Sequence, residues 1–224
     1  MSRKPVIAID GAAGSGKSTA ARLVAERLKF RWLDTGQMYR AVGLKALRAG
    51  VDLCDQSALT SLAQKMQFAL QRRGGEWVLL VDGEDLGESL SSPEADEASS
   101  VVATVVGVRA ALVQAQRHMG AEGGIVVAGR DIQTVVFPDA EVKVFLQASP
   151  GVRAVRRARQ RQGEAAGQDL EQVTAEMRER DARDSTREAA PLRAAPDALV
   201  LDTDRLNVEQ VVSAIVRQVE AGTG

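Results

Sequence analysis

A glycine-rich segment near the start of the chain has the residue types and the spacing that bind phosphate groups. It contains a glycine, four further residues, then glycine, lysine and serine, with threonine next. Such glycines let successive backbone N–H groups surround a phosphate at a helix N-terminus, where unpaired donors already favour an anion. The residues expected to hold the phosphates of a nucleotide are Gly11, Ala12, Ala13, Gly14, Ser15, Gly16, Lys17, Ser18 and Thr19.

Three residues of this segment have separate expected roles. Lys17 would reach the β- and γ-phosphates, Ser18 would offer its hydroxyl to Mg²⁺, and Thr19 would extend the donor set. The alternative is a glycine-rich turn from strand to helix that holds no ligand. A GTP-binding protein is excluded, because it needs an Asn-Lys-x-Asp base-recognition motif and the only asparagine is Asn207.

A second arrangement of charge could also act on phosphates. Arg153, Arg156 and Arg157 lie about one helical turn apart, and no acidic residue lies between them and Glu164. We interpret them as part of a mobile lid, about residues 153–170, whose arginines swing over the bound phosphates and exclude water. A solvated basic helix is the alternative. The apolar run that ends at Asp82 resembles a metal-binding strand end, but its continuation favours a hairpin turn.

Composition limits the other possibilities. The chain has 224 residues, of which 45% are hydrophobic and 26% charged, as in an ordinary globular protein. Lysine plus arginine total 29 and aspartate plus glutamate 30, so the net charge of -1 leaves no basic excess for nucleic acid. With a single cysteine, Cys54, and a single histidine, His118, we expect neither an internal disulfide nor a histidine-rich metal site.

The elements that must position these residues follow from the apolar runs. Short runs at residues 6–9, 31–33, 125–128, 142–146 and 198–201 predict five strands, and helix-length segments separate most of them. This alternation predicts an α/β fold with a parallel five-stranded sheet and helices on both faces. The run at residues 6–9 is too short for a signal peptide, and no window reaches the ~18 apolar residues of a membrane span. We therefore expect a cytoplasmic protein with no membrane partner.

The middle third of the chain has a different pattern. Runs at residues 67–70, 77–81 and 85–86 are separated by glycine-containing turn signals, which predicts a small antiparallel sheet. We expect residues 36–110 to form an inserted domain, and residues 1–35 and 111–224 to form the core domain that carries the phosphate-binding loop and the lid.

Three longer motifs, together with the phosphate-binding loop, resemble those of the bacterial cytidylate kinases, which belong to the nucleoside monophosphate kinases of the P-loop class. The motifs are residues 33–40, LDTGQMYR; residues 129–140, GRDIQTVVFPDA; and residues 180–187, RDARDSTR. The resemblance implies phosphoryl transfer from ATP to CMP or dCMP with Mg²⁺, and it makes residues 36–110 the monophosphate-binding domain. We expect a monomer that acts on small nucleotides.

The resemblance also implies roles for individual residues. Lys17, Arg130 and the lid residue Arg157 would be catalytic. The acceptor phosphate would be held by Arg40, Arg130 and Arg187, helped by Thr35 and Tyr39. The base would be recognised by Ser100, Arg109 and Asp131, and Arg180 and Asp184 would contact ribose and phosphate.

Physical chemistry supports these residue types, although alternatives remain. Arginine binds phosphate oxygens bidentately and keeps its charge, and a carboxylate accepts a hydrogen bond from the amine of cytosine. Uracil has an oxygen at that position and would leave Asp131 facing another acceptor. Alternatively, Asp131 caps a helix, Arg109 lies on a solvated helix face and Ser100 belongs to an ordinary turn. Arg180 and Asp184 have the spacing of a surface ion pair.

Two positions depart from the family pattern. Gln37 stands where a small residue is common, and Gln133 stands where glycine is common. If the backbone at residue 133 needed a positive φ, Gln133 would strain that turn. Two other functions stay open: a kinase for another acceptor, such as UMP or a small hydroxylated metabolite, and a non-catalytic ATP-binding module.

Overall fold

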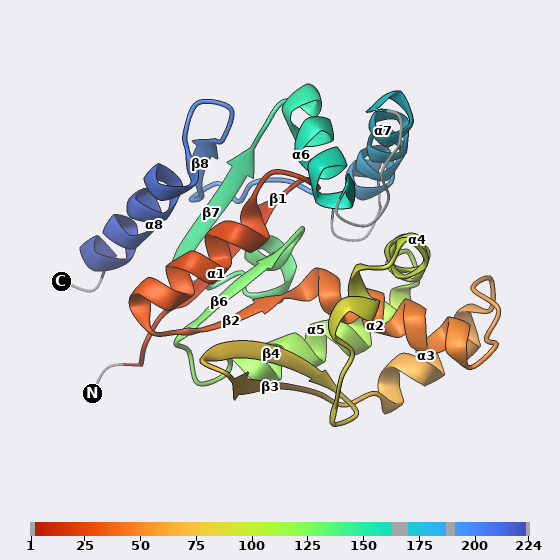
Figure 1. The fold of residues 1–224 in the computed structure, drawn as a ribbon. Helices are drawn as coiled ribbons and strands as arrows, with labels where there is room; N and C mark the ends of the chain where they lie inside the picture. Colours follow the sequence, from red (N-terminus) through yellow and green to blue (C-terminus); the bar gives the residue numbers. More distant parts are fainter. Residues whose placement is uncertain (1–2, 163–169, 187–190, 223–224) are drawn as a thin grey trace. The chain divides into compact units, whose positions relative to one another are not determined.

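The computed structural model describes residues 3–162, 170–186 and 191–222, apart from the side chains of residues 160–162, 180 and 184–186. The chain divides into two compact units. Unit 1 consists of residues 31–125 with the N-terminal residues up to Lys4, and unit 2 consists of Pro5–Phe30 and the chain from Val126 onward. Figure 1 labels most of their helices and strands.

The larger sheet has five parallel strands, as the apolar runs predict. They are β1 (Val6–Gly11), β2 (Arg31–Asp34), β6 (Ile125–Gly129), β7 (Val142–Gln147) and β8 (Leu199–Asp202), in the order β2-β6-β1-β7-β8. Every residue of β1 is buried, and its register with β7 runs from Ile7 beside Val142 to Gly11 beside Leu146. A central strand covered on both faces has this continuous apolar composition.

Helices complete unit 2. They are α1 (Lys17–Leu28), the short helical turn η2 (Ile132–Val136), α6 (Pro150–Gln162), α7 (Leu170–Thr186) and α8 (Val208–Gly222). Helix α8 shows why the sequence folds this way: its buried residues recur at helical spacing, from Val211 and Val212 through Ile215 and Val216 to Val219. This face packs α8 against α1 and β7.

Unit 1 contains the predicted small antiparallel sheet. Its strands are β3 (Phe68–Arg73), β4 (Glu76–Val81) and β5 (Glu84–Asp85), in the order β3-β4-β5. The turn from β4 to β5 begins at Asp82, whose φ is 53° and whose carboxylate accepts from the Gln67 backbone N–H at 2.9 Å. Asp82 is therefore a turn residue, as the hairpin interpretation predicts.

The helices of unit 1 are α2 (Thr35–Arg48), α3 (Gln56–Lys65), the 3-10 turn η1 (Gly87–Ser91), α4 (Pro93–Val102) and α5 (Val106–Gly120). Cys54, the one cysteine of the chain, is exposed in the loop before α3 and donates its backbone N–H to the Asp52 carboxylate at 2.8 Å. Within the described part of the chain, no single helix has the length and hydrophobicity of a membrane span, and α4 and α5 meet those criteria only as a pair bent by 103°.

Helices α2 and α4 approach closely at Gly43. A Cβ added there would lie 2.7 Å from the Ala98 Cβ and 3.1 Å from the Ser99 backbone nitrogen. Real Cβ atoms essentially never lie within 3.0 Å of such a neighbour, so the two helices need a glycine at this crossing. Arg40 lies on α2 and Asp96 on α4, each less than one turn before the contact.

We expect Gly43→Ala to lower the free energy of unfolding by about 1–3 kcal/mol, because the two helices must separate to admit the methyl group. Urea unfolding followed by circular dichroism measures this loss. The matched control is Gly151→Ala, since nothing lies within 4 Å of a Cβ built at that helical glycine. Equal stability of the two variants would contradict the packing argument.

Candidate active site

The loop between β1 and α1 has the backbone of a phosphate-binding site. Gly14 and Gly16 have φ values of 73° and 88°, a conformation that side chains rarely adopt. No side chain caps the N-terminus of α1. The first N–H groups of this helix are thus oriented for an anion.

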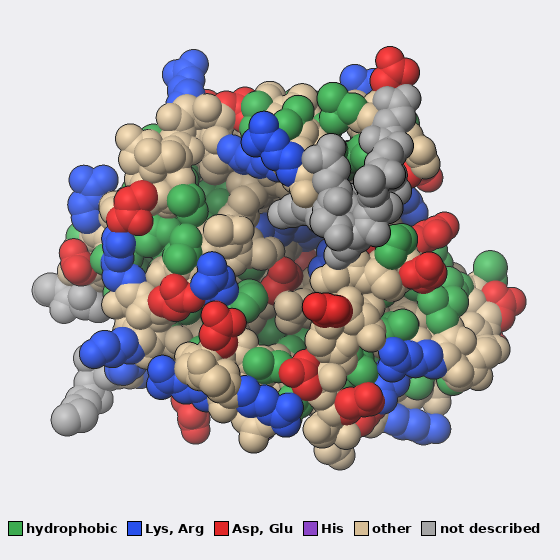
Figure 2. Space-filling model, in the orientation of Figure 1, with side chains coloured by type: hydrophobic (Ala, Val, Ile, Leu, Met, Phe, Trp, Pro, Cys, Tyr) green, Lys and Arg blue, Asp and Glu red, His purple; other side chains and the backbone are tan. Residues whose placement is uncertain are grey.

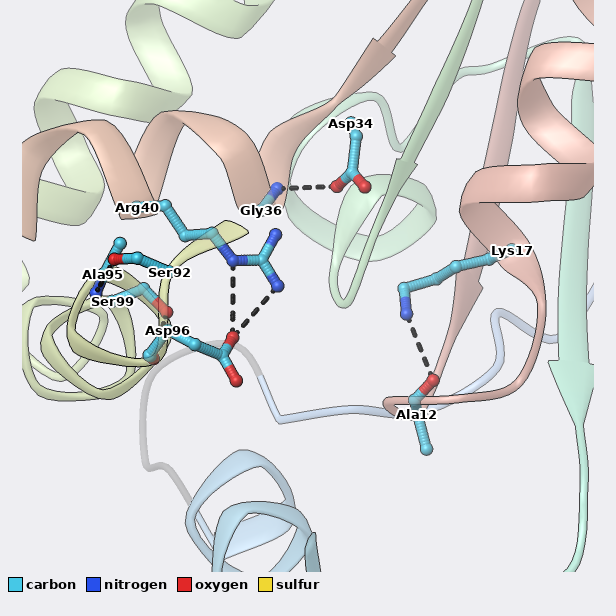
Figure 3. A network of polar contacts seen from close by, with 9 residues as sticks. All are labelled: Ala12, Lys17, Asp34, Gly36, Arg40, Ser92, Ala95, Asp96 and Ser99. Carbon is cyan, nitrogen blue, oxygen red and sulfur yellow. Dashed lines mark hydrogen bonds and ion pairs between the residues drawn. The ribbon is translucent and has the colours of Figure 1, made fainter. Parts of the chain in front are cut away.

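Two side chains inside the loop fit a phosphate ligand. Nζ of Lys17, which is 7% exposed, donates to the Ala12 carbonyl oxygen at 3.0 Å (Figure 3). The Ser15 hydroxyl is buried and has no hydrogen-bond partner among the residues that the structure describes. Buried polar groups are normally paired, so this hydroxyl suits a ligand oxygen. Ser18 occupies the second position of α1, beside these groups.

Two arginines of α6 donate hydrogen bonds to the backbone of the same loop. The Arg153 guanidinium donates to the carbonyl oxygens of Ala13 at 3.2 Å and Ala148 at 3.1 Å, and it pairs with Asp181 at 2.7 Å. Arg156 donates to the Gly14 carbonyl oxygen of the loop at 3.5 Å, and to both the hydroxyl and the backbone oxygen of Thr203, at 2.9 and 2.7 Å. These contacts differ from the expectation that both arginines swing over the phosphates, since Arg153 is only 6% exposed.

The turn after β6 carries Arg130 and Asp131. Asp131 is 5% exposed, while Arg130 is half-buried. Because β6 and β1 are neighbouring parallel strands, their carboxyl ends lie at the same edge of the sheet, where open α/β sheets bind ligands. The structure thereby brings Arg130 and Asp131 to the sheet edge from which the phosphate-binding loop starts.

A fully buried carboxylate, Asp10, lies beneath this edge. It accepts hydrogen bonds from the backbone N–H groups of Ile132 at 3.0 Å and Gln133 at 2.9 Å. Burial raises the pKa of Asp10 to about 6, with a smaller contribution from the Asp131 charge, although the two hydrogen bonds act in the opposite direction. The sequence motifs do not single out Asp10, because a lone carboxylate at a strand end gives no distinct sequence signal.

The raised pKa of Asp10 predicts a pH-dependent difference between Asp10→Asn and the parent chain. The native state holds the Asp10 proton up to about pH 6 but the unfolded chain releases it near 3.8, so the parent loses stability as pH rises through that window. The loss attributable to Asp10 should approach about 3 kcal/mol by pH 7. The variant has no such proton to release.

Chemical denaturation at pH 4.5 and pH 7 tests this difference. The free energy of unfolding of the parent should fall relative to Asp10→Asn between the two pH values. Asp139→Asn, at an exposed aspartate of the same unit, is the control. Parallel pH profiles for the parent and Asp10→Asn would be inconsistent with a raised pKa.

Unit 1 positions the other candidate residues on three helices. The Asp34 carboxylate caps α2 by accepting from the Gly36 backbone N–H at 2.9 Å (Figure 3). Thr35 is buried in the first turn of this helix. Tyr39 follows one turn later, and the Arg109 guanidinium of α5 lies over its ring at 5.9 Å. Arg109 is therefore a buried residue of the interior, not a side chain on a solvated face.

Arg40 has a partner that the motifs did not indicate. Its Nε and Nη2 donate to one carboxylate oxygen of Asp96, at 3.3 and 2.9 Å (Figure 3). Asp96 is 7% exposed, and the next turn of α4 holds Ser99 and Ser100. The ion pair fixes the direction of the Arg40 side chain. In the sequence, Asp96 belongs to an acidic stretch, residues 82–97, which does not indicate a specific partner.

The remaining predicted residues belong to the C-terminal part of unit 2 or to α2. Arg157 is half-buried on α6, and Gln37 is half-buried in the first turn of α2. Arg180 and Asp184 lie on α7, but their side chains fall outside the described residues, as does all of Arg187.

The parallel sheet and the loop that joins β1 to α1 define a P-loop nucleotide-binding protein. A family model described as cytidylate kinase matches residues 7–221, and the chain belongs to the cytidylate kinase family.

Individual relatives agree with this assignment. A protein named cytidylate kinase from Pelotomaculum thermopropionicum is 49% identical over 99% of this chain and 99% of its own length. A bifunctional pantoate ligase/cytidylate kinase from a Synechococcus strain is 49% identical over 96% of this chain, which spans 40% of that protein. The crystal structure of an uncharacterized protein from Eubacterium ventriosum matches 97% of this chain and 99% of its own with a TM-score of 0.53 at 13% identity, which shows a similar fold alone.

Proposed function

We propose that this chain transfers the γ-phosphoryl group of ATP to CMP or dCMP, producing ADP and CDP or dCDP. The observation that carries the proposal is the loop after β1. This loop brings together two glycines with positive φ, the buried Ser15 hydroxyl and the Lys17 ammonium. Membership of the cytidylate kinase family supplies the acceptor.

Residues 11–19 would hold the phosphates of ATP. The backbone N–H groups at the start of α1 bind phosphate oxygens, and Lys17 would exchange its contact with the Ala12 carbonyl for one with the β- and γ-phosphates. Mg²⁺ takes most of its ligands from phosphates and water, and the Ser18 hydroxyl would be a protein ligand. Bound there, Mg²⁺ would neutralise charge on the phosphates.

The acceptor phosphate would be bound by Arg40, Arg130 and Arg187, with Thr35 and Tyr39 as hydrogen-bonding partners. A phosphate acceptor is already ionised at neutral pH, so the reaction needs no general base. It needs two polyanions held in line, which guanidinium groups achieve by bidentate contacts. The Asp96 carboxylate supports this role, because it fixes the direction of the Arg40 side chain.

The cytosine base would be recognised by Ser100, Arg109 and Asp131. The Asp131 carboxylate accepts a hydrogen bond from the exocyclic amine, and Arg109 donates to the carbonyl and ring nitrogen. Burial of both side chains strengthens discrimination, since a mismatched buried acceptor costs more than an exposed one. Arg180 and Asp184 on α7 would contact the ribose and phosphate.

The proposal assigns these roles to separate domains. Residues 36–110 would form the monophosphate-binding domain, and residues 1–35 and 111–224 the core. A lid at about residues 153–170 would carry Arg157 to the transferred phosphate as the third catalytic residue, beside Lys17 and Arg130. Arg153 would act as the fixed base of that lid, because it is tied to the phosphate-binding loop.

The expected partners are small nucleotides. The net charge of -1 and the mixture of acidic and basic side chains on the face drawn in Figure 2 offer no extended basic surface there for a nucleic-acid backbone. We propose that the chain acts as a monomer in the cytoplasm.

An acceptor panel tests the function directly. ADP release, followed by a coupled assay, should depend on CMP or dCMP and should be much slower with UMP or AMP. Turnover with UMP or a hydroxylated metabolite but not CMP would favour a kinase for another acceptor. Binding of ATP without transfer to any monophosphate would indicate a non-catalytic module.

A further inference from the structure

Gln133 replaces the glycine that is common in the family pattern, and the structure gives this side chain specific contacts. It is 1% exposed. Its Nε2 donates to the Val144 carbonyl oxygen of β7 at 3.3 Å, and its Oε1 accepts from the Ala195 backbone N–H, ahead of β8, at 3.0 Å. The orientation of the amide is determined, because one partner only accepts and the other only donates.

The backbone at this position does not strain the turn. Among the described residues other than glycine, only Lys29 and Asp82 have a positive φ. Gln133 therefore adopts an ordinary conformation and adds two hydrogen bonds that a glycine could not make.

Asp10 secures the same turn from the other side. Its two carboxylate oxygens accept separately from the backbone N–H groups of Ile132 and Gln133, and the carboxylate is fully buried. Asp10 also directly precedes Gly11, the first residue of the phosphate-binding loop, in the sequence. Four hydrogen bonds thus join the first turn of η2 to β1, to β7 and to the segment before β8.

Arg130 and Asp131 occupy the two positions immediately before this secured turn. Their own backbone must follow any displacement of Ile132 and Gln133. Misplacement of a substrate-binding group by about 1 Å can reduce activity by roughly 100-fold. Asp10 and Gln133 therefore restrain the main chain that directly follows Asp131.

We propose that Asp10 and Gln133 are positioning residues that hold Asp131 in place for base selection, an inference that rests on the proposed function. Asp10 supplies the principal restraint, and Gln133 adds a second one particular to this chain. Both side chains are almost fully buried, so neither would touch the nucleotide. Both act through the main chain of the β6–η2 turn.

The test is the ratio of kcat/KM for CMP to kcat/KM for UMP, because a change in the amount of folded enzyme does not alter this ratio. In Asp10→Asn the amide nitrogen faces a backbone donor, so one of the two hydrogen bonds is lost. The ratio should fall about 10-fold, and the KM for ATP should stay within about twofold, as expected when a buried hydrogen bond to a charged group is broken. Gln133→Met keeps the length of the side chain and should lower the ratio about threefold.

A double-mutant cycle with Asp131→Asn identifies the route of the effect. Asp131→Asn should itself lower the ratio, and adding Asp10→Asn should lower it no further. The control is Gln116→Met, at another glutamine that is 1% exposed but whose Nε2 has no hydrogen-bond partner among the described residues. It should leave the ratio unchanged.

Each outcome decides between the hypotheses. If Asp131→Asn lowers the ratio and both Asp10→Asn and Gln133→Met leave it unchanged, the positioning role is wrong and the proposed function stands. An additive effect of Asp10→Asn in the Asp131→Asn background also overturns the positioning role. If the parent chain does not phosphorylate CMP, the proposed function fails and the positioning role fails with it. If CMP is phosphorylated but Asp131→Asn leaves the ratio unchanged, the proposed function stands, and the role of Asp131 and the positioning role both fail. Should Asp10→Asn not fold, Gln133→Met decides the matter.

Discussion

Lys17→Ala is expected to reduce kcat by about 100- to 1000-fold, the usual effect of removing one donor that contacts the group being transferred. In the structure the Lys17 ammonium is buried inside the phosphate-binding loop and bonded to the Ala12 carbonyl oxygen. Alanine would leave the loop backbone intact, because the residue lies in the first turn of a helix. ATP should therefore still bind, although more weakly.

Single-turnover kinetics, with the enzyme in excess over ATP and with CMP saturating, separates the chemical step from binding. Lys65→Ala is a suitable control, since Lys65 is an exposed lysine in the last turn of α3. Transfer by Lys17→Ala at the rate of the parent chain would refute the assignment of Lys17 as catalytic.

Arg130→Ala is expected to lower kcat/KM for CMP by about 100- to 1000-fold, because the acceptor phosphate would lose a bidentate, charge-assisted contact in the transition state. The KM for ATP should change little, since the phosphates of ATP would be held mainly by the loop after β1. This asymmetry distinguishes a missing acceptor contact from a general loss of structure.

Steady-state kinetics with each substrate varied in turn measures the asymmetry. Arg217→Ala, at an exposed arginine of α8 in the same unit, controls for the loss of a positive charge. If Arg130→Ala raised the KM values for ATP and CMP equally, Arg130 would not be specific to the acceptor.

Local sequence patterns predicted the elements but not the contacts that join them. The strands, the phosphate-binding loop and the small antiparallel sheet follow from apolar periodicity and glycine positions, which act over a few residues. The ion pair of Arg40 with Asp96 spans 56 positions, and the hydrogen bond from Gln133 to Asp10 spans 123. Such pairs depend on how helices and strands pack, and one sequence carries no direct signal of them.

The arginines of α6 illustrate the same limit. Their spacing predicted a basic helix but could not show which face is buried. Arg153 bonds to the backbone of the phosphate-binding loop and to Asp181, whereas Arg157 is half-buried. Gln133 is the converse case: the departure from the family pattern was visible, but its partners at Val144 and Ala195 became apparent only in the folded chain.

The exposed thiol of Cys54 makes the chain ready for site-specific spectroscopy. Since the sequence holds no second cysteine, a maleimide dye would attach at one place without prior removal of other thiols. That place lies in unit 1, the unit that carries Tyr39, Arg40 and Arg109. Fluorescence from such a label would report on this unit while nucleotides are added, in the otherwise unaltered protein.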